Sequence, residues 1–343
     1  MLVVIAAQVY CHVASIHRTK AAYTRGQHLL EVMLRFQHLS ATLPVDKINA
    51  YRGLHTKFTK LPPPSYSKRT AEVFEEMAVW LLEDRCCLLP LALDLKGDGS
   101  LGLPSWVMDF SAKPPIEPNY WRGRLVLYEA YCSRLRLDCA FEHRPCGKLC
   151  LNGIEVDKVS AVASTTFGVS IVSDATDHIE LLKEWFMFAT GYEPSSFWFN
   201  NATFCATMLG GFVKDPSQGS GVRKANAADY DQWQHELWAM PYSKTTGRFH
   251  GLTMESHVTA VLGRAIFRTA SGSYGVGPST VRPGDSLWLF GGGNAPFVTR
   301  QKSTSDPMER HHALLGHCYH DWLMNSWTAS DGAGSQPITC VLV

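Results

Sequence analysis

The chain has 343 residues, of which 45% are hydrophobic and 18% charged, so it can bury a large apolar core. This composition excludes an intrinsically disordered protein. Lys and Arg (32 residues) nearly balance Asp and Glu (31), which leaves a formal net charge of +1. Because nucleic-acid-binding proteins usually carry a basic excess, we expect no nucleic-acid partner.

The first 25 residues are rich in apolar side chains but lack features of a signal peptide. No basic residue precedes the apolar stretch, and Gln8 interrupts it early. No apolar run reaches the roughly 20 residues that a membrane-spanning helix needs. The ten cysteines are scattered, which is typical of free thiols in a reducing compartment. We therefore expect a cytoplasmic protein without a membrane span, in which residues 1–25 form a helix.

The N-terminal third is predicted to be helical. Apolar residues recur at helical spacing over 27–39 and 68–84, and Asp46 can begin a brief helix between them. Glu75 and Glu76 are adjacent in the second helix and therefore point in different directions. We interpret them as part of a solvated face and not as an acid–base pair.

A turn-rich, proline-marked segment near residue 112 predicts a domain boundary. We expect a mainly helical region over 1–112 and a mixed, β-rich region over 113–343. Within the second region, Asn152–Gly153 lies between apolar runs and predicts a hairpin turn between two strands.

The stretch 214–231 is polar and rich in Gly, Ser and Asn, and it predicts a long surface loop. Helices are expected from about Asp177, from about Gln232 and over 255–262.

The final third has the strongest strand pattern. Residues 264–278 predict two strands joined by a Ser-Gly turn, and three further extended segments are expected over 285–290, 296–300 and 312–324. The predicted fold class is therefore α+β, with a helical N-terminal third packed against a β-rich C-terminal part that has antiparallel strands and hairpins.

Three consecutive glycines, Gly291–Gly293, raise the question of a phosphate-binding loop. They lack the Lys and hydroxyl residue of a P-loop, and Pro296 opens a β-rich run where a dinucleotide-binding motif would open a helix. We interpret the glycines as a turn in which the backbone needs positive φ, and we expect no cofactor.

Clusters of His and Cys offer candidate chemistry, but each has a structural interpretation. His311, His312, His317, Cys318 and His320 are dense, yet strand alternation places His317 and Tyr319 on one face and Cys318 and His320 on the other.

Cys139, His143, Cys146 and Cys150 are spaced more loosely than structural zinc ligands. We interpret both clusters as structural.

A nucleophilic triad could be built from Cys318 or Cys205 with a histidine and Asp109, but ten Cys and fourteen His make such triplets easy to assemble by chance. Asp109 and Asp285 are expected to bond backbone groups in turns, and Trp106 is expected to lie in the core. We assign no catalytic, cofactor-binding or metal-ligating residue, and a non-enzymatic role is favoured.

Five blocks of sequence carry a resemblance to a known family. Four are the segments 41–54, 64–78, 103–111 and 272–285. The fifth matches at Gly284, Asp285, Gly291–Gly293, Pro296, Phe297, Val298, Arg300, Gly316, Tyr319, Leu323 and Met324. In this order the blocks resemble the part of fungal heterokaryon-incompatibility (HET) proteins that follows the HET domain. The motifs of the HET domain itself are absent, and residues 1–25 resemble a remnant of its last helix.

This resemblance implies a HET-like protein without the N-terminal effector domain. Its expected role is non-catalytic interaction or regulation in fungal self/non-self recognition, with a protein partner that binds loops such as 214–231. The alternative is an enzyme or accessory protein, for example cyclase-like, of fungal specialised metabolism. It would bind a small molecule in an aromatic-lined pocket near Trp288 or Trp322.

Overall fold

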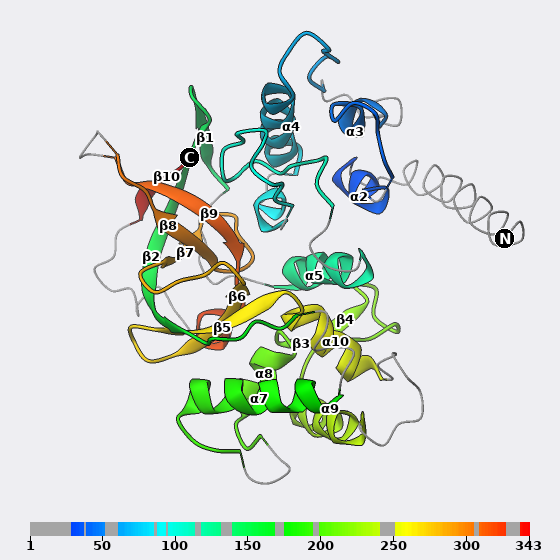
Figure 1. Cartoon of the computed structure of the whole chain (residues 1–343), viewed down its shortest axis with the longest axis vertical. Coiled ribbons are helices and arrows are strands. Elements are labelled where there is room, and N and C mark those ends of the chain that lie inside the picture. Colours follow the sequence, from blue (N-terminus) through cyan, green and yellow to red (C-terminus); the bar gives the residue numbers. More distant parts are fainter. Residues whose placement is uncertain are drawn as a thin grey trace, which may run out of the picture. The chain divides into compact units, whose positions relative to one another are not determined.

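The computed structural model describes most of the chain in two compact units (Figure 1). The described residues are 29–37, 39–51, 61–85, 88–93, 95–113, 118–131, 139–168, 175–194, 199–240, 251–304, 309–326 and 337–343. The first unit contains the described residues up to Arg85 with 95–103 and 108–113, and the second contains the others. The helix expected over 1–25 lies outside the described residues, and the boundary expected at residue 112 stays a prediction.

The first unit is helical, as predicted. Its helices are α2 (Leu29–Arg35), α3 (Asp46–Asn49) and α4 (Thr70–Arg85). Helix α4 buries Phe74, whose ring meets that of Phe110 edge-on at 5.2 Å. The Gln37 side-chain amide donates hydrogen bonds to the carbonyl oxygens of Phe110 and Ala112. These contacts hold the segment around residue 110 against the helices of the same unit.

The second unit is built on a closed, mostly antiparallel sheet (Figure 1). Its strands are β1 (Phe141–Arg144), β2 (Lys148–Val162), β5 (Arg264–Thr269), β6 (Tyr274–Pro278), β7 (Ser286–Phe290), β8 (Phe297–Gln301), β9 (His311–His317) and β10 (Ile338–Leu342). Pairings run from β2 through β7, β8, β9 and β10 back to β2, which closes a barrel. The β9–β10 pair is parallel.

Strand β2 is long and takes part in most of this closure. Its first half pairs with β1 and β10, its middle with β7 and its last residues with β5. Strand β6 pairs with β5 and bridges from Val276 to Tyr319, just after β9. The barrel encloses an apolar cluster of Ile154, Val159, Ala265, Phe267, Val281, Leu287, Leu289, Val298, Cys318 and Leu323.

Helices lie around this barrel. They are η2 (Leu89–Ala92), α5 (Pro118–Ala130), α7 (Ala175–Thr190), α8 (Ala202–Met208), α9 (Ala227–Ala239), α10 (Leu252–Val261) and α11 (Asp321–Asn325). Helix α7 packs against β5, α8 packs against β6, and α10 contacts both α9 and α5 (Figure 1). The α+β class, the helical N-terminal third and the antiparallel hairpins are confirmed.

The hairpin predicted at Asn152–Gly153 is wrong. Strand β2 runs without a turn from Lys148 to Val162, and the chain reverses earlier, where Cys146 and Gly147 have positive φ. Gly153 serves a different purpose, because a Cβ there would lie 2.6 Å from the Leu289 carbonyl oxygen. The glycine therefore permits close approach of β7 in the middle of a strand.

The long loop predicted over 214–231 is also wrong. Strands β3 (Phe212–Lys214) and β4 (Val222–Lys224) form a hairpin, and α9 begins at Ala227. The polar residues that indicated a loop lie in the turn over 215–221, in β4 and at the start of α9. Asn226 caps α9, and the Asp229 carboxylate accepts a hydrogen bond from the Asn226 N–H in return.

The glycines at 291–293 form a turn between β7 and β8, as predicted, and β8 rather than a helix follows them. Gly292 alone of the three has positive φ, at +75°. A Cβ at this position would lie 2.3 Å from the Cys139 Cβ and 2.7 Å from its Cα. Conformation and close packing both require glycine here.

We expect Gly292→Ala to destabilise the protein by several kcal/mol, because it adds a backbone clash to the roughly 1 kcal/mol of left-handed strain. Gly284→Ala is the matched control, since Gly284 also has positive φ (+91°) but nothing lies within 4 Å of a Cβ there. Urea unfolding of both variants measures the difference. Equal losses in the two variants would contradict the close packing at Gly292.

Candidate functional site

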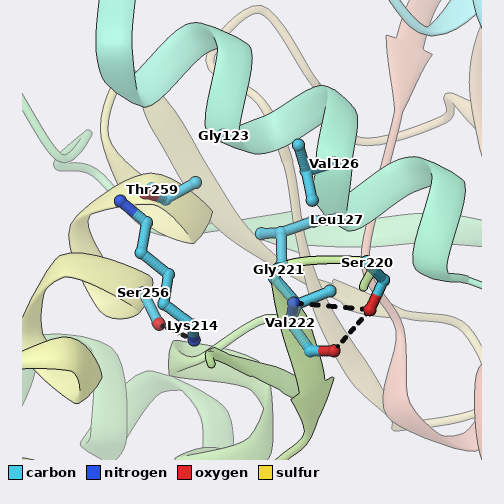
Figure 2. A pocket seen from close by; sticks show the side chains of 9 residues that line it. All are labelled: Gly123, Val126, Leu127, Lys214, Ser220, Gly221, Val222, Ser256 and Thr259. Atoms are coloured by element: carbon cyan, nitrogen blue, oxygen red, sulfur yellow. Dashed lines mark hydrogen bonds between the residues drawn. The ribbon is translucent and has the colours of Figure 1, made fainter. Parts of the chain in front are cut away.

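A cavity of about 170 Å³ lies between α5, α10 and the β3–β4 hairpin, and we call it the hairpin cavity (Figure 2). It is lined by Gly123, Val126 and Leu127 of α5, by Lys214, Ser220, Gly221 and Val222 of the hairpin, and by Ser256 and Thr259 of α10. Helices α5 and α10 approach closely at Gly123, where a Cβ would lie 2.9 Å from the Thr259 methyl carbon. Small residues thus set the shape of this cavity.

The polar groups around the hairpin cavity are paired with one another. Lys214 Nζ lies 2.9 Å from Glu255 Oε2. The Lys214 N–H donates to Ser256 Oγ at 2.8 Å (Figure 2). The Thr259 hydroxyl donates to the Glu255 carbonyl oxygen, and the Ser220 hydroxyl donates to that of Val222. With these groups paired, the cavity presents mainly an apolar surface to any occupant.

The turn of the β3–β4 hairpin is exposed and well ordered by hydrogen bonds. The Asp215 carboxylate accepts bonds from the backbone and the hydroxyl of Ser217. Arg223 makes two 2.7 Å bonds to the Asp229 carboxylate, which joins the hairpin to the start of α9. These bonds hold the pKa of Asp229 below its usual range. The three-residue spacing of Asn226 and Asp229 is typical of a capping box, and this pattern could have predicted the start of α9 where a loop was expected.

The histidines of the C-terminal cluster lie in separate environments. His311 pairs with Glu309 at 2.7 Å and is partly exposed, whereas buried His312 lies 2.9 Å from the Thr299 hydroxyl.

His317 Nε2 accepts a bond from Arg264 at 2.7 Å, so its Nδ1 carries the proton that faces the Ala92 carbonyl oxygen. Burial and the charge of Arg264 lower the pKa of His317 well below its usual range, so the ring stays neutral.

His320 caps helix α11. Its Nδ1 accepts a hydrogen bond from the Leu323 N–H, and its Nε2 lies 2.9 Å from the Ser273 hydroxyl. Both ring nitrogens therefore have structural partners.

The candidate nucleophiles are buried thiols. Cys318 is fully buried in the barrel core, and Cys205 lies in α8. Burial raises the pKa of both thiols to about 12, so both stay protonated at neutral pH. Since the thiolate is the nucleophilic form, neither is activated. Asp109 lies in the first unit and bonds the backbone N–H groups of Ser111 and Ala112, as predicted.

The Cys139–Cys150 cluster is dispersed. Cys146 is exposed in the β1–β2 turn, Cys150 is buried in β2, and His143 stacks edge-on against Trp106. No group of three or more His, Cys, Asp or Glu side chains in the described part of the chain could hold a metal ion. Trp106 is buried, as predicted, and its indole N–H donates to the Gly147 carbonyl oxygen.

Asp285 closes the turn after Gly284 by accepting a bond from the Arg282 N–H, as predicted. Its main partner, which was not expected from the sequence, is Arg300, whose guanidinium makes two 2.8 Å bonds to the buried carboxylate. Asp285 and Arg300 both belong to the fifth block of sequence that resembles HET proteins. Their presence in the same block is the sequence signal that could have indicated this ion pair.

A buried histidine pair was also missed. His178 of α7 and His257 of α10 approach Nε2 to Nε2 at 3.0 Å, and His257 Nδ1 lies 2.9 Å from the Met208 carbonyl oxygen. Phe167 and Trp233 pack against the pair. Burial lowers the pKa of His257 to about 4, so this pair is neutral and joins the two helices.

Trp288 and Trp322 do not line the hairpin cavity. Trp288 is fully buried and stacks on Phe290, whereas Trp322 is 42% exposed on α11. No helix among the described residues is both long and apolar enough to cross a membrane.

The fold therefore defines an α+β protein built on a closed β-barrel. Residues 214–332 match the Het-6 beta-barrel domain, so the C-terminal part of the chain contains a region of the HET family. The match covers β4 to β9 but not β2 or β10, which complete the barrel. No curated protein and no solved structure matches the chain.

We expect His320→Ala to lower the free energy of unfolding by about 1–2 kcal/mol, because the α11 cap and the bond to Ser273 are both lost. His320→Asn should recover much of this loss, since Asn caps helices well. His311→Ala, at a partly exposed ion pair, should change stability by less than about 0.5 kcal/mol. Urea unfolding measures all three, and an unaltered His320→Ala variant would contradict the capping role.

Acidification is expected to destabilise the protein as the pH falls below 6.5. Burial lowers the pKa of His257 and His320 to about 4, whereas unfolding returns each to its ordinary value of 6.5. The resulting stabilisation is complete above pH 6.5 and is lost toward pH 4, at about 1.4 kcal/mol per pH unit for each ring. Urea unfolding between about pH 7 and pH 5 measures the slope. His320→Asn should reduce the pH dependence of the free energy of unfolding by the contribution of one histidine. A variant with the same slope as the parent would contradict a contribution from His320.

Proposed function

We propose that the protein acts as a non-catalytic interaction protein in fungal self/non-self recognition. The observation that carries this proposal is the match of residues 214–332 to the Het-6 beta-barrel domain. The candidate nucleophiles support it, because Cys205 and Cys318 are buried and protonated at neutral pH. A cytoplasmic location fits a chain with free cysteines among its described residues.

The turn of the β3–β4 hairpin is the proposed contact site for a protein partner. Residues 216–221 are exposed, and the bonds from Asp215 and Arg223 hold the turn in one conformation. A preorganised turn loses little conformational entropy on binding, which favours recognition. The turn also lies at the start of the matched domain.

Vegetative pairing of fungal strains tests this function. Strains that carry the gene, a deletion, or the double variant Gln218→Arg/Gly219→Arg are paired with tester strains, and heterokaryon survival is scored. We expect the deletion and the turn variant to change the outcome with at least one tester. Tyr192→Arg is the matched control, because Tyr192 is 76% exposed and far from the hairpin in the sequence.

Thermal melting of each purified variant separates a lost contact from a lost fold. Gly219 has nothing within 4 Å of a Cβ, so the turn variant is expected to fold normally. A deletion strain that behaves like the parent in every pairing would overturn the proposed function. A turn variant that folds and behaves like Tyr192→Arg would overturn the proposed contact site.

A further inference from the structure

A second cavity, of about 200 Å³, lies at the open end of the β3–β4 hairpin, away from its turn, and we call it the tyrosine cavity. It is lined by Tyr131 at the end of α5, by Gly211, Phe212 and Lys224 of the hairpin region, and by Tyr319, Met324 and Asn325. These residues come from three separate parts of the second unit. The cavity therefore exists only in the folded barrel.

The walls of the tyrosine cavity are aromatic. The Tyr131 ring centroid lies 5.7 Å from that of Phe212 and 5.8 Å from that of Tyr319. Gly211 has positive φ, and a Cβ there would lie 2.7 Å from the Tyr319 hydroxyl. An apolar cavity of about 150 Å³ is large enough for a benzene ring. The size and walls of this cavity therefore suit one planar ring.

The Tyr131 hydroxyl supplies an unused hydrogen-bond donor at this cavity. Tyr131 is only 6% exposed, yet no described residue forms a hydrogen bond with its hydroxyl. Burial raises the pKa of Tyr131, so the hydroxyl keeps its proton. The hydroxyl is therefore available to donate a hydrogen bond to a ligand oxygen in the cavity.

Lys224 supplies a positive charge at the rim of the same cavity, where its side chain is exposed. Its ammonium donates to Asn325 Oδ1 at 2.7 Å and forms no ion pair with a carboxylate in the described part of the chain. The Asp321 carboxylate is held by hydrogen bonds from the Tyr319 hydroxyl and the Asn325 amide. Lys214 in the hairpin cavity differs, because Glu255 neutralises it.

We infer that the tyrosine cavity binds a small planar aromatic carboxylate of the hydroxybenzoate class. The ring lies among Tyr131, Phe212 and Tyr319, the carboxylate meets the Lys224 ammonium, and a ring oxygen accepts from the Tyr131 hydroxyl. This ligand class matches the aromatic walls, the lysine ammonium at the rim and the free tyrosine hydroxyl. The inference goes beyond the proposed function and does not depend on it.

Calorimetric titration of the full chain with 4-hydroxybenzoate tests this inference. We expect a dissociation constant below about 1 mM, which corresponds to about −4 kcal/mol. The neutral isostere 4-hydroxybenzamide should bind at least about tenfold more weakly, because it lacks the charge that pairs with Lys224. No binding of 4-hydroxybenzoate, or equal binding of the amide, would overturn the inference.

Variants locate the site. Lys224→Met should weaken 4-hydroxybenzoate binding by about tenfold, and Tyr131→Phe should weaken it by about fivefold through loss of one hydrogen bond. Lys214→Met is the matched control in the hairpin cavity and should leave the affinity unchanged. An equal loss in Lys214→Met and Lys224→Met would place the ligand elsewhere and overturn the inference.

A second measurement needs no ligand. Tyr131→Phe removes only a hydroxyl that has no partner, so the thermal stability of the ligand-free variant should equal or exceed that of the parent. A marked destabilisation would show that the hydroxyl has a structural partner, and this would overturn its assignment as an unused donor.

Discussion

Backbone pairing along β2 is the constraint on which the second unit depends. This one strand pairs with β1, β5, β7 and β10, so it closes the barrel through β10 and also joins the barrel to the β5–β6 pair. The register shifts between Glu155 and Asp157 and between Val159 and Ala161 bend the strand between its β10-paired and β5-paired residues. A closed barrel has no free edge strand, and the enclosed side chains of β5, β7 and β8 form its core.

Much of the fold could be predicted from local pattern, whereas its closure could not. Helix α4 and strands β5 to β8 follow directly from helical spacing and strand-forming residues. The pairing of β2 with β10 joins segments far apart in the sequence, and no local signal reports it. Asn152–Gly153 has the composition of a turn, but the glycine is there because β7 lies against it. Tertiary contact decides the conformation in that case.

The candidate sites show the same division. The spacing of the C-terminal histidines along the sequence argued against a metal site. In the structure each of these histidines has a different partner: Glu309, Thr299, Arg264 or Ser273. Neither cavity could be predicted, because each is formed by α5, the β3–β4 hairpin and either α10 or α11. Whether a tyrosine hydroxyl has a partner depends on what surrounds it after folding. Residues of the hairpin line both cavities, so the same short element shapes both.

The order in which the barrel strands occur along the chain has a consequence for biosynthesis. Strand β2 is translated long before β10, and β10 pairs with both β2 and β9. On the ribosome, the first half of β2 therefore lacks one neighbour until residue 342 has emerged from the exit tunnel. Such an unpaired edge is prone to incorrect association, and chaperones commonly shield surfaces of this kind. Nascent chains of this protein should thus depend on chaperones until β10 has emerged from the exit tunnel.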